Sequence, residues 1–217
     1  RIGADGTDAY SLLSTIGRDC VGALQFLPDG EEPQALDKLS GEQLNDEQIA
    51  ALLKDLDVTP PGIRRENDFR ISVAGAQEKT ALLFHDGRWI EPTGTTPTTH
   101  IIKPQIGKLP NGMDLTNSVE NEYLCLKLME AFGLRVARAE MASFADQKAL
   151  VIERFDRLWA RDGRLLRLPQ EDLCQALSVP PTRKYQNEGG PGIAEIMDVL
   201  RGSDEPTQDR MDFFKAN

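Results

Sequence analysis

Residues 67–103 read NDFRISVAGAQEKTALLFHDGRWIEPTGTTPTTHIIK, and they alternate between strand-like runs and short polar turns. The first turn, Ala74–Lys79, is polar and contains one glycine. The second, His85–Gly87, contains an Asp-Gly pair, which supplies the positive φ values of a tight hairpin. The last run, Thr99–Lys103, is rich in β-branched residues and ends in a lysine. This pattern predicts an antiparallel sheet with a polar loop before its first hairpin.

Lys103 is a candidate site residue because of the order of the elements around it. In protein-kinase-like folds a phosphate-covering loop precedes a strand lysine that holds ATP phosphates, and a glutamate from the next helix holds that lysine. The pattern predicts a helix over about 117–132, in which Glu122 lies in line with apolar residues. We therefore expect Glu122 to pair with Lys103. The alternatives are a lysine that only extends its ammonium into solvent, and a Glu122 that pairs with another cation.

The polar loop is the candidate phosphate-binding loop. It consists of Ala74, Gly75, Ala76, Gln77, Glu78 and Lys79. Small residues let backbone N–H groups approach phosphate oxygens, and a lysine adds positive charge. The loop has neither the GxxxxGK[ST] pattern of a Walker loop nor the GxGxxG pattern of a typical eukaryotic kinase. An ordinary hairpin loop has a similar composition.

Five motifs resemble, in order and spacing, the HipA-type serine/threonine kinase toxins of bacterial toxin–antitoxin modules. They are ISVAGAQEK at 71–79, THIIK at 99–103, ERFDR at 153–157, LPQED at 168–172 and KYQNEGGPGI at 184–193. The resemblance implies an α+β, protein-kinase-like fold, with an antiparallel-sheet ATP-binding lobe that leads into a helical lobe cut short. It also implies that Glu153, Arg154 and Phe155 form the adenine-binding hinge and that Ser72 is autophosphorylated.

The same resemblance implies that the catalytic residues are absent. Family members carry a base aspartate and a Mg²⁺-binding asparagine in an Asp-x-His-x-x-x-Asn segment, followed by a metal-binding aspartate. His85 and His100 are the two histidines here, and neither has these neighbours. We therefore expect a fragment or truncated copy that lacks the family's N-terminal subdomain and catalytic lobe. Its cofactors would be ATP and Mg²⁺, with the metal ligands outside this chain and no metal site within it.

Three interpretations remain open. The first is a toxin that arrests growth as an ATP-dependent serine/threonine protein kinase, inactive as this isolated chain. The second is a non-catalytic module that binds a nucleotide or an antitoxin. A purely structural domain is the third possibility, and it would show no nucleotide-dependent change in melting temperature.

The expected partners follow from the resemblance and from the charge. The resemblance implies a HipB-like helix-turn-helix antitoxin and a protein substrate, which for the family's type member is an aminoacyl-tRNA synthetase. The net charge of −10 argues against direct binding to a phosphate backbone, so DNA would be contacted mainly through the antitoxin. No apolar run is long enough to span a bilayer, so we expect no membrane contact and a cytoplasmic location.

Composition and the residues that end helices and strands divide the chain into three expected parts. Residues 1–66 would contain a buried strand at about 21–27 and an amphipathic helix that starts near Ser40 and ends before Pro60. Residues 67–155 would form the kinase-like nucleotide-binding lobe. Residues 156–217 would begin the helical C-terminal lobe, with helices near 170–176, 192–200 and 205–215.

Overall fold

The computed structural model describes residues 8–35, 37–56, 77–109 and 111–217. It forms two compact units. The first takes in the chain up to Leu128 and returns at 137–169, and the second combines 129–136 with 170–217. The first unit is α+β and the second is helical.

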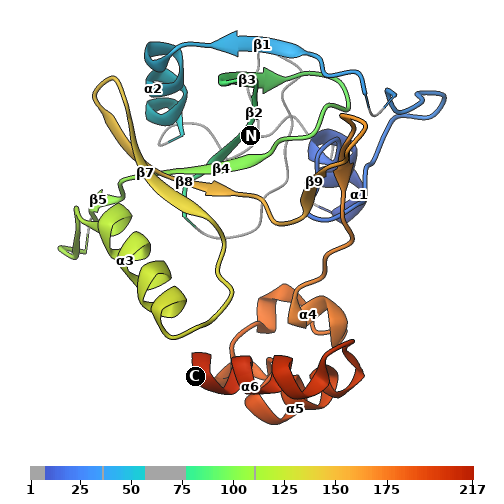
Figure 1. Cartoon of the computed structure of the whole chain (residues 1–217), viewed down its shortest axis with the longest axis vertical. Coiled ribbons are helices and arrows are strands. Elements are labelled where there is room, and N and C mark those ends of the chain that lie inside the picture. The colour runs from blue at the N-terminus through green and yellow to red at the C-terminus, as the bar shows by residue number, and fades with distance from the viewer. Residues whose placement is uncertain (1–7, 36, 57–76, 110) are drawn as a thin grey trace. The chain divides into compact units, whose positions relative to one another are not determined.

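The first unit is built on a six-stranded antiparallel sheet in the order β1-β3-β2-β4-β8-β7 (Figure 1). The strands are β1 (Gly41–Leu44), β2 (Thr80–His85), β3 (Arg88–Pro92), β4 (His100–Pro104), β7 (Ala139–Phe144) and β8 (Gln147–Glu153). The β2–β3 turn has Asp86 at φ 49° and Gly87 at φ 74°, as the Asp-Gly pair predicts. The expected mixed fold with an antiparallel sheet is confirmed.

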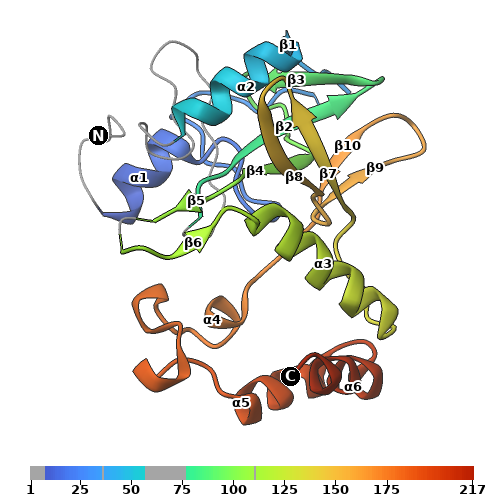
Figure 2. The ribbon, with the colours of Figure 1, turned by 90° about the vertical axis from the view of Figure 1, so that its left-hand side faces the viewer.

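Two helices lie on opposite faces of this sheet (Figure 2). Helix α2 (Asp46–Asp55) buries its apolar face against one side, where Ile102 of β4 joins the core. Helix α3 (Ser118–Ala131) lies on the side of Lys103, the next residue along β4. Because successive side chains of a strand point to opposite faces, β4 presents an apolar side chain to α2 and a lysine to α3.

The core between α2 and the sheet depends on a few large side chains. Leu53 of α2 is 2% exposed and packs in this cluster. We expect Leu53→Ala to lower the free energy of unfolding by about 2–5 kcal/mol, because it removes buried methyl groups and leaves a cavity. The matched control is Leu24→Ala, at a leucine that is 66% exposed, with an expected change within about 0.5 kcal/mol. Urea denaturation measures both, and equal losses would contradict this description of the core.

Two expectations for the N-terminal part are wrong. Residues 21–27 form no strand, because Gly22 adopts a φ of 75° and its backbone groups bond to side chains of Asp156 and Arg157 instead of to a neighbouring strand. Residues 41–44 form β1, which pairs with β3, and the helix begins only at Asp46. A capping box between Asn45 and Gln48 fixes that start.

Smaller elements complete the first unit. They are helix α1 (Ala9–Ile16), the two-stranded pair β5 (Gly107–Lys108) and β6 (Asp114–Leu115), and the hairpin β9 (Arg157–Trp159) and β10 (Leu165–Arg167). The hairpin follows β8 after three residues, so the chain leaves the main sheet through a short connection, residues 154–156.

The second unit is helical, as expected. It contains α4 (Leu173–Ala176), α5 (Ile193–Val199), α6 (Pro206–Ala216) and three 3₁₀ turns, η1 (Pro181–Arg183), η2 (Gln186–Glu188) and η3 (Leu200–Gly202). α4 starts with a capping box between Asp172 and Gln175. Gly189, in the GGPG motif, follows η2 at φ 89°, a conformation that favours glycine.

Candidate nucleotide-binding site

Lys103 and Glu122 form an ion pair. The Nζ atom of Lys103 lies 2.6 Å from Oε1 of Glu122, and both side chains are partly buried. β4 supplies the lysine from the middle of the sheet, between β2 and β8, and α3 supplies the glutamate from its second turn. The structure therefore brings together the two residues that the sequence pairs. A lysine held this way presents a fixed cation, which can receive a phosphate group.

The start of α3 is fastened to the end of β4. The side chain of Gln105 accepts a hydrogen bond from the Val119 N–H and donates one to Glu120, and the Ile106 N–H donates to Oγ of Ser118. Hydrogen bonds from Lys148 and Gln105 lower the pKa of Glu120 to about 2. These contacts fix where Glu122 lies relative to Lys103. Sequence reasoning missed Gln105, whose one signal is its place two residues after Lys103.

Lys79 is the second lysine of the site. It lies directly before Thr80, which pairs with Ile102, and so comes next to Lys103. Its side chain is buried, and its ammonium donates to the carbonyl of Gln77. Burial and the nearby charge of Lys103 lower the pKa of Lys79. Lys79 and Lys103 are thus close enough to repel each other, and the charges of Glu78 and Glu122 partly offset this repulsion.

The rest of the candidate loop is described in part. Gln77 donates from Nε2 to the carbonyl of Pro104, and Glu78 is half-buried beside Lys79. Ala74, Gly75, Ala76 and the candidate autophosphorylation site Ser72 lie outside the described residues.

The crossing segment, residues 153–157, leads from β8 into β9. Its backbone is held by hydrogen bonds from the Glu153 N–H to the Arg138 carbonyl and from the Arg154 N–H to the Thr99 carbonyl. Phe155 is 69% exposed, whereas Arg154 is only 3% exposed. Of the three expected hinge residues, Phe155 therefore offers its ring to a ligand. Arg154 turns its side chain inward.

That inward side chain belongs to a buried arginine cluster, which we define as Asp19, Arg154, Asp156, Arg157 and Arg167. Asp19 accepts hydrogen bonds from all three arginines, and Asp156 accepts them from Arg154 and Arg157. The guanidinium of Arg154 reaches both carboxylates, at 2.7 Å from Asp156 and 3.3 Å from Asp19. Sequence reasoning missed Asp19 because 135 positions separate it from Arg154.

The carboxylates of this cluster predict a dependence of stability on acid. Burial raises the pKa of Asp19, but Arg157, Arg154 and Arg167 outweigh it and lower the pKa below its ordinary value. The pKa of Asp156 is also lowered, because Arg154 and Arg157 outweigh its burial. A carboxylate whose pKa is lower in the folded state stabilises the fold at pH values above its unfolded-state pKa of about 4. This stabilisation is lost as the pH falls through the folded-state pKa.

We therefore expect the free energy of unfolding to fall steeply below about pH 4. Urea denaturation at several pH values between 7 and 3 measures this. The control is Asp19→Asn, which cannot titrate at this position, so its stability should fall less steeply over the same range. Identical acid slopes for the two proteins would contradict the prediction.

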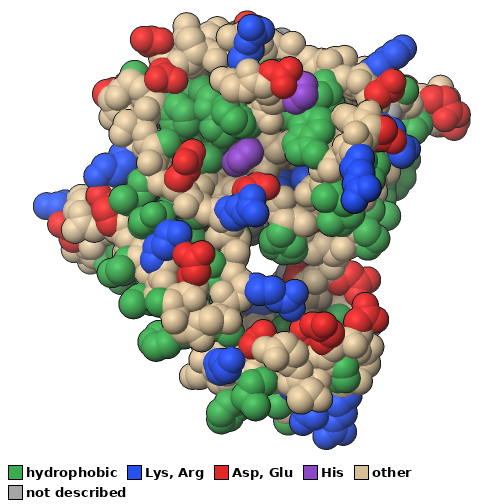
Figure 3. Space-filling view, viewed as in Figure 1, with side chains coloured by type: hydrophobic (Ala, Val, Ile, Leu, Met, Phe, Trp, Pro, Cys, Tyr) green, Lys and Arg blue, Asp and Glu red, His purple; other side chains and the backbone are tan. Residues whose placement is uncertain are grey.

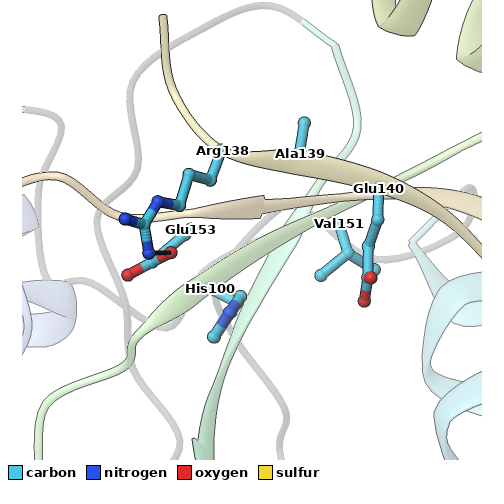
Figure 4. Close-up of a pocket in the computed structure, with 6 residues that line it drawn as sticks. All are labelled: His100, Arg138, Ala139, Glu140, Val151 and Glu153. Carbon is cyan, nitrogen blue, oxygen red and sulfur yellow. Dashed lines mark ion pairs between the residues drawn. The ribbon is translucent and has the colours of Figure 1, made fainter.

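A separate hollow of about 250 Å³ lies on the other face of the sheet (Figure 4). It is lined by His100, Arg138, Ala139, Glu140, Val151 and Glu153. His100 is three residues before Lys103 in β4 and pairs with Glu153, so their side chains point away from Lys103. The side chain of Glu153 therefore lies outside the lysine site. Only its backbone remains as a contact for a base there.

The hollow is lined by several ionisable side chains. Burial lowers the pKa of His100, which favours the neutral form of its ring. The Arg138 guanidinium lies 3.7 Å from the Glu153 carboxylate, and both groups are largely exposed. The same face carries hydrophobic patches among mixed charges (Figure 3). Within the described ranges, no group of three or more His, Cys, Asp or Glu side chains could hold a metal ion.

Helices of the described residues are all too short or too polar to cross a membrane.

Comparison with known proteins points to one family. The family profile described as the HipA-like C-terminal domain matches residues 71–217. The protein Y4mE of Sinorhizobium fredii is 38% identical over 202 residues, which are 92% of this chain and 47% of that protein. The serine/threonine-protein kinase toxin HipA of Shewanella oneidensis is 29% identical over 202 residues, 93% of this chain and 44% of the toxin.

The fold agrees with a solved structure. A chain in the complex of Shewanella oneidensis HipA, HipB and their operator DNA matches with a TM-score of 0.71 and 25% sequence identity, over 97% of this chain and 49% of that chain. The chain thus spans about half the length of the relatives that it matches.

Proposed function

Because the chain belongs to the family of HipA-like C-terminal domains, we propose that it forms the ATP-binding part of a HipA-type serine/threonine protein kinase. The observation that carries the proposal is the pair of Lys103 and Glu122, 2.6 Å apart, with β4 and α3 in the order that protein kinases use. A kinase lysine must be held in one place, because phosphoryl transfer depends on the position of the phosphates.

In this proposal ATP lies on the α3 side of the sheet. Lys103 and Lys79 attract its phosphates, and the loop of residues 74–79 covers them. Glu122 keeps Lys103 in place. Phe155 packs on the adenine ring, and backbone groups of the crossing segment contact the adenine edge. The hollow beside His100 lies on the opposite face and takes no part.

Neither a metal site nor a catalytic base is assigned to this chain. Protein kinases use Mg²⁺ with ATP, but the described residues offer no cluster that could hold it, so we assign no metal ligand here. The sequence also contains no Asp-x-His-x-x-x-Asn segment. We therefore propose that these 217 residues alone bind ATP without transferring its phosphate.

We infer a wider biological role by analogy with the relatives. A serine/threonine kinase toxin arrests growth by phosphorylating a protein target, and we propose this role, with Ser72 as a site of autophosphorylation. Phosphorylation would place up to about two negative charges beside a loop built for ATP phosphates, so it would inhibit the kinase. Because HipA of Shewanella oneidensis occurs in a complex with HipB and operator DNA, we propose a HipB-like antitoxin as the partner and the cytoplasm as the location.

A non-catalytic module that binds a nucleotide or an antitoxin is the second candidate. It is compatible with these 217 residues, which contain no Asp-x-His-x-x-x-Asn segment. ATP binding alone does not separate the two, since both allow it.

Two assays on the same protein separate the candidates. Isothermal titration calorimetry measures ATP binding, and transfer of labelled γ-phosphate to the protein itself or to bacterial lysate proteins measures catalysis. The proposal predicts binding without transfer for the 217 residues alone, and transfer by a protein of the relatives' full length that contains them. Transfer by the 217 residues alone would contradict the assignment of catalysis to residues outside this chain, and no binding would contradict the nucleotide site.

A further inference from the structure

The crossing segment holds Phe155 between two buried neighbours. Arg154 and Asp156 are 3% and 4% exposed, whereas Phe155 between them is 69% exposed. Both neighbours belong to the buried arginine cluster, in which they bind each other through two hydrogen bonds of 3.0 and 2.7 Å. The cluster thus fixes the backbone on both sides of the one ring that the segment leaves open.

Residues 19–22, which are distant in the sequence, complete this cluster with further hydrogen bonds. The Gly22 N–H donates to Asp156 at 2.8 Å, and the Cys20 carbonyl accepts from both Arg154 and Arg157. Asp19 adds hydrogen bonds from the three arginines and from the Thr98 hydroxyl, the last at 2.6 Å. An irregular segment is therefore folded around the crossing segment through side-chain contacts.

A buried charge cluster of this kind is a weak source of stability. Its three arginines and two aspartates are all buried or nearly so, and the desolvation penalty of such charges offsets much of the free energy gained from their attraction. Apolar side chains of similar size often stabilise a fold as well or better. What directional charged contacts supply in addition is one defined geometry.

We propose that the buried arginine cluster is a positioning device, which fixes the crossing segment in the conformation that receives the nucleobase, with residues 19–22 as a built-in part of the base subsite. The inference rests on the proposed function and deepens it. Its residues act through Phe155 and the segment backbone, so they are positioning residues and touch no ligand themselves. A segment already fixed in its bound conformation loses less entropy on binding.

Thr98 gives a mild way to loosen the cluster. Its hydroxyl donates to Asp19 and accepts from Arg154 at 2.8 Å, and Thr98→Val removes both bonds at nearly constant volume. Thr96 provides the matched control. It is also a buried threonine, and its hydroxyl accepts from the Ser40 N–H and donates to Gln34, but it bonds to no member of the cluster. Thr98→Ser keeps the hydroxyl and serves as the rescue.

The test measures the two ends of the nucleotide separately, with adenosine as the base probe and tripolyphosphate as the phosphate probe, both in competition with a fluorescent ATP analogue. For Thr98→Val we expect the Kd for adenosine to rise about tenfold and the Kd for tripolyphosphate to stay within about twofold of the wild type. Thr96→Val and Thr98→Ser should bind both probes like the wild type. Melting temperatures of all variants report their stability.

Three results would overturn the inference. Thr98→Val could bind adenosine normally despite a lower melting temperature, it could lose both probes equally, or Thr96→Val could lose adenosine to the same extent. Each would assign the cluster to general stability. A wild-type protein that binds neither probe would overturn the nucleotide site itself, and the positioning role with it, so the two failures are distinguishable.

Discussion

Lys103→Ala is expected to weaken ATP binding roughly 10- to 100-fold, because a charge-assisted contact to phosphate contributes about 1.5–3 kcal/mol. The loss should be specific to the phosphate end, since Lys103 lies near the end of β4 and the crossing segment stays unchanged. Isothermal titration calorimetry with ATP and with adenosine measures this: ATP binding should fall while adenosine binding persists.

The matched control is Lys108→Ala. Lys108 is an exposed lysine in β5, and its ammonium lies 3.6 Å from Asp114. It carries the same charge but lies outside the site, so its loss should change the Kd for ATP by less than about twofold. Equal effects of the two substitutions would show that any surface lysine contributes as much to ATP binding as Lys103 does. That result would contradict a phosphate site at Lys103.

Asp19→Ala is expected to lower the free energy of unfolding by about 3–5 kcal/mol. The substitution leaves three buried arginines with one carboxylate, Asp156, and an uncompensated buried charge is costly. Urea denaturation at pH 7 measures the loss. Because small domains are stable by only about 5–15 kcal/mol, the effect should also appear as a much lower melting temperature.

Asp162→Ala is the control for that prediction. Asp162 also pairs with an arginine, Arg164 at 2.9 Å, but about half of each side chain is exposed. Exposed pairs contribute little, so the expected change stays within about 1 kcal/mol. If Asp19→Ala were no more damaging than Asp162→Ala, the cluster would not hold residues 19–22 to the crossing segment.

Much of the sheet could be predicted from local sequence. The strands around the Asp86–Gly87 turn and the helix over α3 follow from alternation, turn residues and helical periodicity, all of which act over a few residues. The pairing of Glu122 with Lys103 could also be predicted, because a carboxylate in an apolar stripe indicates a buried partner. The role of this pair in binding ATP stays a prediction.

What failed depends on contacts between distant residues. The apolar run at 21–27 looks like a strand, but the backbone groups of Gly22 bond to side chains more than 130 positions away. Residues 41–44 read as the start of a helix, and only their pairing with β3 makes them a strand. In ERFDR, the sequence does not show that Arg154 turns inward while Phe155 turns outward, because that depends on Asp19.

The most direct test of the central claim is a crystal structure of the protein with a non-hydrolysable ATP analogue. The account predicts that phosphate oxygens lie within hydrogen-bonding distance of Nζ of Lys103, with the adenine ring against Phe155 and Glu122 still paired with the lysine. An analogue bound elsewhere, such as in the hollow beside His100 on the opposite face of the sheet, would contradict it.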